Sequence, residues 1–272
     1  MSVTSATEAL SSLLPTWGRF AGARHVYERN LLVYRRAWLI VFSGFFEPLF
    51  YLFAVGVGVG TLVGDVQGPG GQTITYAQFV TPGLLAASAM NGAVLESTMN
   101  VFFKLKFGRI YDAVLSTPVE PGDIAVGEIS WALTRGGLYA VGFLVVAGIG
   151  GFIPSWWGLL ALPAAILIGL AFAGVGMAAT TYMKSWQDFD LVTLFVLPMF
   201  LFSAVFYPLD ILPPAFQLLT QLSPLYHGVE LMRGFMFGMF DLSMIGHAAV
   251  LVAMWLTGIA IAARRIRSLL LT

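Results

Sequence analysis

The stretch at residues 156–183, WWGLLALPAAILIGLAFAGVGMAATTYM, decides the fold class of this chain. It lies within an uncharged run between Arg135 and Lys184, and it exceeds the about 20 helical residues that cross a bilayer core. The rest of the chain has the same character, because 58% of its residues are hydrophobic, 10% are charged and the mean hydropathy is +0.84. Soluble domains carry about 25% charged residues. The sequence therefore predicts a membrane protein with many spans.

Charged and turn-forming residues divide the chain into six predicted spanning helices. These are residues 37–63, 76–103, 124–149, 156–183, 191–207 and 242–263. Residues 64–75 form a polar, glycine-rich loop after the first span. Residues 208–240 are apolar but interrupted by prolines, so they predict two short helices, about 213–222 and 228–237, that re-enter the membrane or lie at its surface. The expected fold is all-α, with this re-entrant helical hairpin before the last span.

Residues 1–36 precede the first span as a separate segment. Apolar residues recur there at helical spacing, whereas Arg19 and Arg24 lie off the stripe: Leu10, Leu13, Leu14, Trp17, Phe20 and Ala21. This pattern predicts an amphipathic helix in the cytoplasmic interface. Two interpretations stay open: an elbow that braces the bundle or gates lateral entry of a lipid, and a simple membrane anchor. No signal peptide is expected, because no basic stretch precedes an apolar core within residues 1–16.

The distribution of lysine and arginine predicts the orientation in the membrane. A cytoplasmic N-terminus leaves only Arg233 outside and puts these residues inside: Arg19, Arg24, Arg29, Arg35, Arg36, Lys104, Lys106, Arg109, Lys184, Arg264, Arg265 and Arg267. We therefore expect a multi-pass protein of the plasma (inner) membrane with both termini in the cytoplasm.

Residues able to drive chemistry are scarce. None of the three lysines follows a glycine, which excludes a P-loop, and the Gly56-x-Gly58-x-Gly60 pattern lies inside an apolar span, where it favours close helix packing. The chain has no cysteine, and its three histidines are far apart in sequence. We expect no catalytic residue, metal site or bound cofactor, and the net charge of zero gives no sign of a nucleic-acid partner. Energy for transport must come from an ion gradient or from a separate chain.

Glu47 and Glu96 are single carboxylates inside predicted spans. A bare carboxylate there is unfavourable by several kcal/mol, so each should face a cavity or a partner or be protonated. Three interpretations stay open: proton carriers, the polar lining of a substrate path, and structural hydrogen bonds between helices. Arg135 is the nearest basic residue that can pair with Glu96.

The segment 104–123 between the second and third spans contains a predicted amphipathic helix. Phe107, Ile110, Tyr111 and either Val114 or Leu115 recur at helical spacing before the closing Ser116-Thr117-Pro118. Exposed aromatic residues on such a helix predict a docking surface for a partner, or a helix that lies flat on the membrane.

Three stretches resemble the ABC-2 type exporter permeases, and most closely their nodulation-type lipo-oligosaccharide exporters. They are LSTPVEPGDIAVGE at residues 115–128, PMFLFSAVFYP at 198–208 and PLYHGVELMR at 224–233. The stretches occur in the family's order within the same six-span layout. One departure is Glu47-Pro48, where the family often has aspartate before proline.

The resemblance implies a permease that forms a homodimer or pairs with a sister permease. It also implies a separate ATPase subunit that binds ATP and magnesium and pushes on the coupling region, with these residues in contact: Phe107, Arg109, Ile110, Tyr111, Asp112 and Leu115. In the outward re-entrant region, His227, Glu230 and Arg233 either stabilise the outer gate or contact cargo. Glu230 and Arg233 are spaced for an ion pair on one helix.

The expected function is export of an amphipathic cargo, namely a glycolipid, a lipid-linked oligosaccharide or a hydrophobic drug. Two alternatives come from other classes. An ion-coupled secondary transporter would commonly show inverted repeats and broken helices, and no repeat is visible. A lipid-modifying membrane enzyme would need a polar cluster, for which Asp188 and Asp190 are the only compact carboxylate pair, and that pair is better explained as the start of a span.

Overall fold

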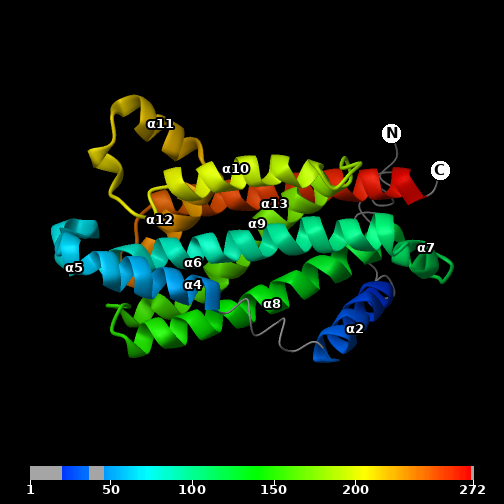
Figure 1. Ribbon diagram of the computed structural model, residues 1–272, viewed down its shortest axis with the longest axis horizontal. Coiled ribbons are helices and arrows are strands. Elements are labelled where there is room, and N and C mark those ends of the chain that lie inside the picture. The colour runs from blue at the N-terminus through cyan, green and yellow to red at the C-terminus, as the bar shows by residue number, and fades with distance from the viewer. Residues whose placement is uncertain (1–19, 37–45, 271–272) are drawn as a thin grey trace, which may run out of the picture.

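The computed structural model describes residues 20–36 and 46–270 as an elongated helical bundle with one small hairpin (Figure 1). Its α-helices are α2 Phe20–Arg36, α4 Phe46–Tyr51, α5 Gly60–Val63, α6 Tyr76–Leu95, α7 Ile110–Leu115, α8 Pro121–Ile149, α9 Ala161–Thr180, α10 Asp188–Phe202, α11 Pro214–Leu222, α12 Pro224–Phe237 and α13 Ser243–Leu270. Wider π turns form η1 Leu52–Val59, η3 Glu96–Asn100 and η4 Phe103–Phe107. Tighter 3-10 turns form η2 Pro69–Gly71, η5 Trp156–Leu160 and η6 Leu209–Ile211.

The two ends of the bundle differ in charge. Helices α2 and α7 and the C-terminal end of α13 lie at one end, and α5 and α11 lie at the other (Figure 1). We call the first the basic end, because it carries Lys104, Lys106, Arg109, Lys184, Arg264 and Arg265.

Four helical segments of the described chain are long and apolar enough to cross a membrane: Phe46–Val63, Pro121–Ile149, Trp156–Thr180 and Ser243–Ile266. They correspond to the predicted first, third, fourth and sixth spans, although the start of the first lies outside the described residues. Helix α6 continues through η3 and η4 to Phe107, but Gln78, Ser88 and Asn91 make it more polar. Helix α10 is shorter than the about 20 residues of a full span. The expected second and fifth spans are helical, but they are not among the four segments that are long and apolar enough to cross a membrane.

Helix α10 ends five residues before the predicted boundary at Tyr207. Ala204 has a φ of 56°, in the left-handed region that continues no helix. The Ser203 hydroxyl donates to the Met199 carbonyl and lies 2.6 Å from the Ser223 hydroxyl, so side chains hold this corner. The predicted end of the fifth span is therefore wrong.

The loop at 64–75 contains a hairpin that the all-α prediction missed. Strand β1 Asp65–Gln67 pairs antiparallel with β2 Thr73–Thr75, with Val66 opposite Ile74. Gly70 and Gly71 make the turn with φ of 82° and 78°, which glycine adopts without strain. Thr75 then begins α6 with a reciprocal hydrogen-bonded cap to Gln78.

Small residues bring the helices of the bundle close together. A Cβ added at Gly258 of α13 would lie 2.5 Å from the Gly174 carbonyl carbon of α9. Gly56 packs against Ala77 and Val80 of α6, as the predicted close packing of the glycine pattern requires. The largest fully buried side chains, including Phe143, Ile168 and Met232, fill the space between α6, α8, α9 and α12.

Two short helices replace a span before α13, as predicted. Helix α11 exposes Leu218 and Leu222, whereas α12 is buried in the bundle through Leu225, Val229 and Met232. Helix α12 begins at Pro224 rather than at 228, because proline fits the first turn of a helix.

The predicted amphipathic helix at 10–21 lies almost entirely outside the described residues. Helix α2, which follows it, packs against α8 with Ala23, Val26 and Asn30 buried.

Candidate functional site

A buried polar cluster links three segments at the basic end. Glu128 of α8 accepts hydrogen bonds from Arg29 and Asn30 of α2 and from Lys104 of η4, at 3.1, 2.9 and 2.6 Å respectively. The Lys104 ammonium also donates to the Asn30 side-chain oxygen at 3.1 Å. Glu128 and Asn30 are 4% and 2% exposed, so the charges are screened little by water. We call these four residues the Glu128 cluster.

A glycine places α2 close enough to α8 for this cluster to form. A Cβ added at Gly127 would lie 2.7 Å from the Ala23 carbonyl oxygen and from the Val26 Cβ. Because Gly127 precedes Glu128, the close contact and the buried carboxylate come from consecutive residues of the same turn.

The coupling region differs from its predicted form in one respect. Phe107 is 65% exposed, and Arg109, Ile110 and Asp112 are also exposed, but Tyr111 is only 3% exposed. The expectation that Tyr111 is exposed for docking is therefore wrong. The helix α7 begins at Ile110 rather than at 107, because Arg109 has a left-handed φ of 41° that interrupts the helical path. Leu115, at its end, is half-buried.

Tyr111 instead faces the Glu128 cluster. Burial, together with the negative charge of Glu128, raises the pKa of the Tyr111 phenol well above its usual value. Its hydroxyl oxygen has no hydrogen-bond partner among the residues that the structure describes. Helix α7 thus places an uncharged, buried aromatic ring beside the cluster.

A second ion pair lies within the bundle, between Glu96 and Arg135. Arg135 of α8 pairs with Oε1 of Glu96, and Asn100 donates to the other carboxylate oxygen at 2.7 Å. The Arg135 guanidinium lies 5.4 Å from the Tyr34 ring centroid and 5.6 Å from that of Tyr139. Glu96 begins the π turn η3, a distortion often found at functional sites.

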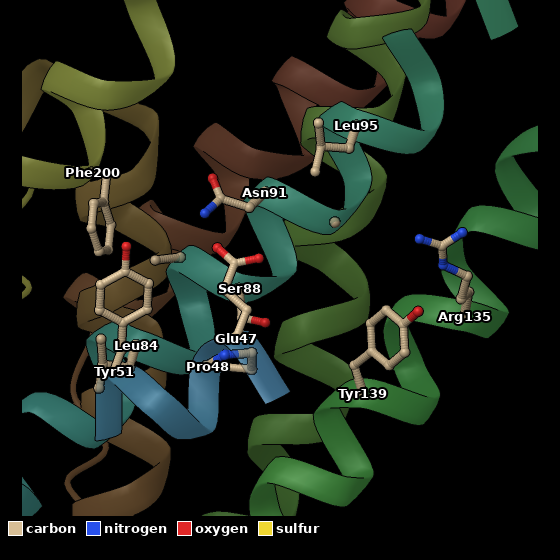
Figure 2. A pocket seen from close by; sticks show the side chains of 12 residues that line it. Glu47, Pro48, Tyr51, Leu84, Ser88, Asn91, Leu95, Arg135, Tyr139 and Phe200 are labelled. Carbon is tan, nitrogen blue, oxygen red and sulfur yellow. The ribbon is translucent and has the colours of Figure 1, made fainter. Parts of the chain in front are cut away.

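Glu47 does not join this pair but lines a cavity beside it. Figure 2 shows Glu47 beside Ser88 and Asn91 of α6, with Arg135 and Tyr139 across on α8. The cavity has a volume of about 60 Å³ and adjoins a larger one of about 230 Å³ between α4, α6 and α10. Of the three intramembrane residues chosen from the sequence, Glu47 and Arg135 line this cavity. Glu96 is connected to it only through its ion pair with Arg135.

The outer region gathers the remaining chosen residues around α12. Arg233 and Glu230 form an ion pair of 2.6 Å, at the spacing predicted. The Arg233 guanidinium also donates to the Ala204 carbonyl and stacks 4.5 Å from the Phe79 ring centroid, which ties the end of α10 to α12 and α6. His227 does not contact this pair, and its Nδ1 lies 2.7 Å from Nδ1 of His247 on α13.

Sequence reasoning missed the Glu128 cluster, although Glu128 ends one of the three diagnostic stretches. Its signal was the carboxylate itself, since an acidic residue a few positions inside a predicted span is rare and needs partners. Lys104 was counted only as a flanking positive charge. Within the described chain, no group of three or more histidine and carboxylate residues is arranged to hold a metal ion.

Comparison of the sequence with known proteins shows the family of the chain. The family model described as ABC-2 type transporter matches residues 23–237, which include the Glu128 cluster, the Glu96–Arg135 pair and the outer α12 region. The chain belongs to the ABC-2 type transporter family. It is therefore a transport permease, an integral membrane component that is not itself the ATPase, and its family generally works with an ATP-binding subunit.

Individual relatives are similar over most of their length. Nodulation protein J of Rhizobium leguminosarum bv. viciae is 36% identical over 83% of this chain and 86% of its own. Nodulation protein J of Rhizobium meliloti is 37% identical over 78% and 80%. The inner membrane transport permease YadH of Escherichia coli is 31% identical over 74% and 77%.

Proposed function

We propose that this ABC-2 permease is the membrane subunit of an exporter that moves an amphipathic cargo with energy from ATP hydrolysed by a separate subunit. The observation that carries the proposal is the connection between exposed α7 and the buried Glu128 cluster. Phe107, Arg109, Ile110 and Asp112 offer a surface of mixed aromatic and charged character at the basic end. Tyr111, directly behind that surface, packs toward residues of α2, η4 and α8.

The force of ATP-driven closure then reaches three segments at once. Lys104 is continuous with α6, Arg29 and Asn30 belong to α2, and Glu128 belongs to α8. A push on α7 is transmitted through charge-assisted hydrogen bonds, which are stronger and geometrically stricter than neutral ones. In this proposal the basic end faces the cytoplasm and the inner membrane holds the permease, in agreement with the positive-inside rule. ATP and magnesium bind to the partner.

A second permease copy, or a sister permease, completes the proposed assembly. No residue of α10 is buried in the single chain, although the helix carries Leu194, Phe195 and Leu197. Phe50 and Phe53 of the first span are also exposed, and Phe50 lines a further open hollow together with Glu47. Exposed apolar faces beside a polar cavity fit a pathway formed between two copies. The cargo classes remain a glycolipid, a lipid-linked oligosaccharide or a hydrophobic drug.

The test is transport in vesicles that contain the permease together with its candidate ATPase. We expect cargo movement to require ATP, to stop with vanadate and to survive a protonophore. Transport by the permease alone under a proton gradient would contradict the proposal and favour the ion-coupled alternative. In that case, Glu47 and Glu96 would be the residues to neutralise first.

A further inference from the structure

An apolar groove lies between α9, α10, α13 and the end of α6. It shares Val94, Val192 and Val196 with the cavity of about 230 Å³ near Glu47, but Glu47 does not line it. Its volume is about 780 Å³, within the ~300–1,000 Å³ range of ligand pockets. Phe172, Val175 and Ala179 of α9 form one wall. Leu191, Val192, Phe195, Val196 and Met199 form the wall on α10.

The groove has the depth of one membrane leaflet. It extends along α10 from Asp188 to Met199, which is about 16 Å at the ~1.5 Å rise of a helical residue. Half of a hydrocarbon core is about 15 Å. Pro224 and Met254 close the end of the groove that lies deep in the bundle. The two charged lining residues, Lys184 and Asp188, lie at the opposite end. A space that is polar at one end and apolar for one leaflet matches an acyl chain with its headgroup.

The polar rim is more positive than negative. Lys184 is exposed and forms no ion pair with any residue that the structure describes. The Arg265 guanidinium stacks 4.5 Å from the ring centroid of Tyr182, another residue lining the groove. The Asp188 carboxylate accepts the backbone N–H groups of Lys184 and Ser185 at 2.6 and 3.1 Å, so its charge is held against the chain. This rim is complementary to a phosphate.

We propose that the groove binds an acyl chain of an anionic phospholipid from the leaflet at the basic end, with the lipid phosphate at Lys184 and Arg265. The bound lipid fills the space behind α10 and supports a helix that buries none of its residues in its own subunit. The proposal concerns a resident membrane lipid rather than cargo, and it does not depend on the proposed ATPase partner.

The absence of cysteine from the chain allows a direct test with single-cysteine variants. Val175→Cys and Val192→Cys place a label on opposite walls of the groove, and Leu138→Cys places one on the exposed face of α8 as a control. Each purified variant carries a benzophenone and is reconstituted in vesicles of equal phosphatidylglycerol and phosphatidylcholine with identical acyl chains. After illumination, intact-mass spectrometry identifies the attached lipid.

We expect phosphatidylglycerol adducts to exceed phosphatidylcholine adducts about fivefold or more at positions 175 and 192, as one or two cations near an anionic headgroup predict. The ratio should be near one at position 138. When Lys184→Gln is added to the Val175→Cys or Val192→Cys variant, the ratio of phosphatidylglycerol to phosphatidylcholine adducts should fall toward one. Lys184→Arg should preserve the ratio.

Three results would overturn the proposal. One is an equal lipid ratio at all three positions. Another is a doubled mass, which would mean that a second copy covers the groove. The last is attachment within the same chain without lipid, which would mean that α10 closes onto α9. Because the measurement needs no nucleotide or cargo, its outcome is independent of the transport assay.

Discussion

The Lys104 ammonium lies 2.6 Å from the Glu128 carboxylate in a site where the Lys104 side chain is 10% exposed and that of Glu128 is 2% exposed. The two residues belong to segments on either side of the coupling region. Their pairing closes a loop that contains α7, so α7 cannot move far without straining this bond. The buried position makes the pair sensitive to loss of either partner, because an uncompensated charge would remain.

Glu128→Gln should destabilise the protein by about 3–5 kcal/mol, because it leaves the buried Lys104 without its carboxylate. Thermal unfolding of the purified variant in detergent measures the effect. Arg24→Gln is the matched control, since it breaks the exposed 2.6 Å pair with Glu28 and should leave the stability almost unchanged. If the two substitutions changed the thermal stability equally, burial of the Glu128 cluster would add nothing to its contribution to stability.

Tyr111→Phe should leave stability at neutral pH within about 1 kcal/mol of the parent, because the removed hydroxyl has no hydrogen-bond partner among the described residues. Its effect should appear in alkali. The pKa of Tyr111 is raised in the folded state, so its contribution is complete below pH ~10, the unfolded value, and is lost as the pH rises above that. Urea unfolding at a series of alkaline pH values should show a shallower fall in stability for the variant. Parallel curves would contradict the burial of a protonated phenol.

Gly127→Ala should loosen the packing of α2 on α8, with a loss of about 1–3 kcal/mol from overpacking. The added Cβ would lie 2.7 Å from the Ala23 carbonyl oxygen, and backbone cannot yield as a side chain can. Gly136→Ala in the same helix meets no atom within 4 Å and should be neutral or stabilising by up to ~1 kcal/mol. Proteolysis of α2, followed over time in both variants, tests whether the loss is local to that helix.

Glu96→Gln should destabilise the bundle because Arg135, whose side chain is only 16% exposed, loses its full counter-charge. The double variant Glu96→Leu/Arg135→Leu should recover much of that stability, since apolar replacement of a whole buried pair is often close to neutral. Melting temperatures of the single and double variants decide this point. Transport by the stable double variant would then assign the pair a structural role, and loss of transport would place it on the pathway.

The long apolar helices and the two short helices before α13 could be predicted from sequence alone. Composition determines where a chain can cross lipid, and prolines at 208, 213, 214 and 224 exclude a continuous span there. The end of α10 could not be predicted, because Ala204 adopts its left-handed conformation where Arg233, distant in sequence, binds its carbonyl. The β1–β2 hairpin was hidden in a stretch whose glycines indicate only a loop.

Residues of the site were predictable only where their partners were near in sequence or few in number. Glu230 and Arg233 are three residues apart, and Glu96 has Arg135 as its nearest basic candidate. The Glu128 cluster joins residues 98 and 74 positions apart, and its lysine sits at a span boundary where positive charge is ordinary. The burial of Tyr111 likewise depends on the tertiary position of α7, which helical spacing does not contain.

The two π turns η3 and η4 lie in the continuous helical segment that carries both Glu96 and Lys104. Each π turn inserts a residue relative to α-helical winding, and a residue corresponds to about 100° of rotation. Glu96 pairs with Arg135 in the middle of the bundle and Lys104 pairs with Glu128 at its end, and both partners belong to α8, about two turns apart. In regular α-helical winding, the eight-residue step from Glu96 to Lys104 would leave the two side chains about 80° apart, and the extra residue that a π turn absorbs reduces this angle. The placement of both side chains against α8 is therefore encoded in an insertion rather than in a side chain.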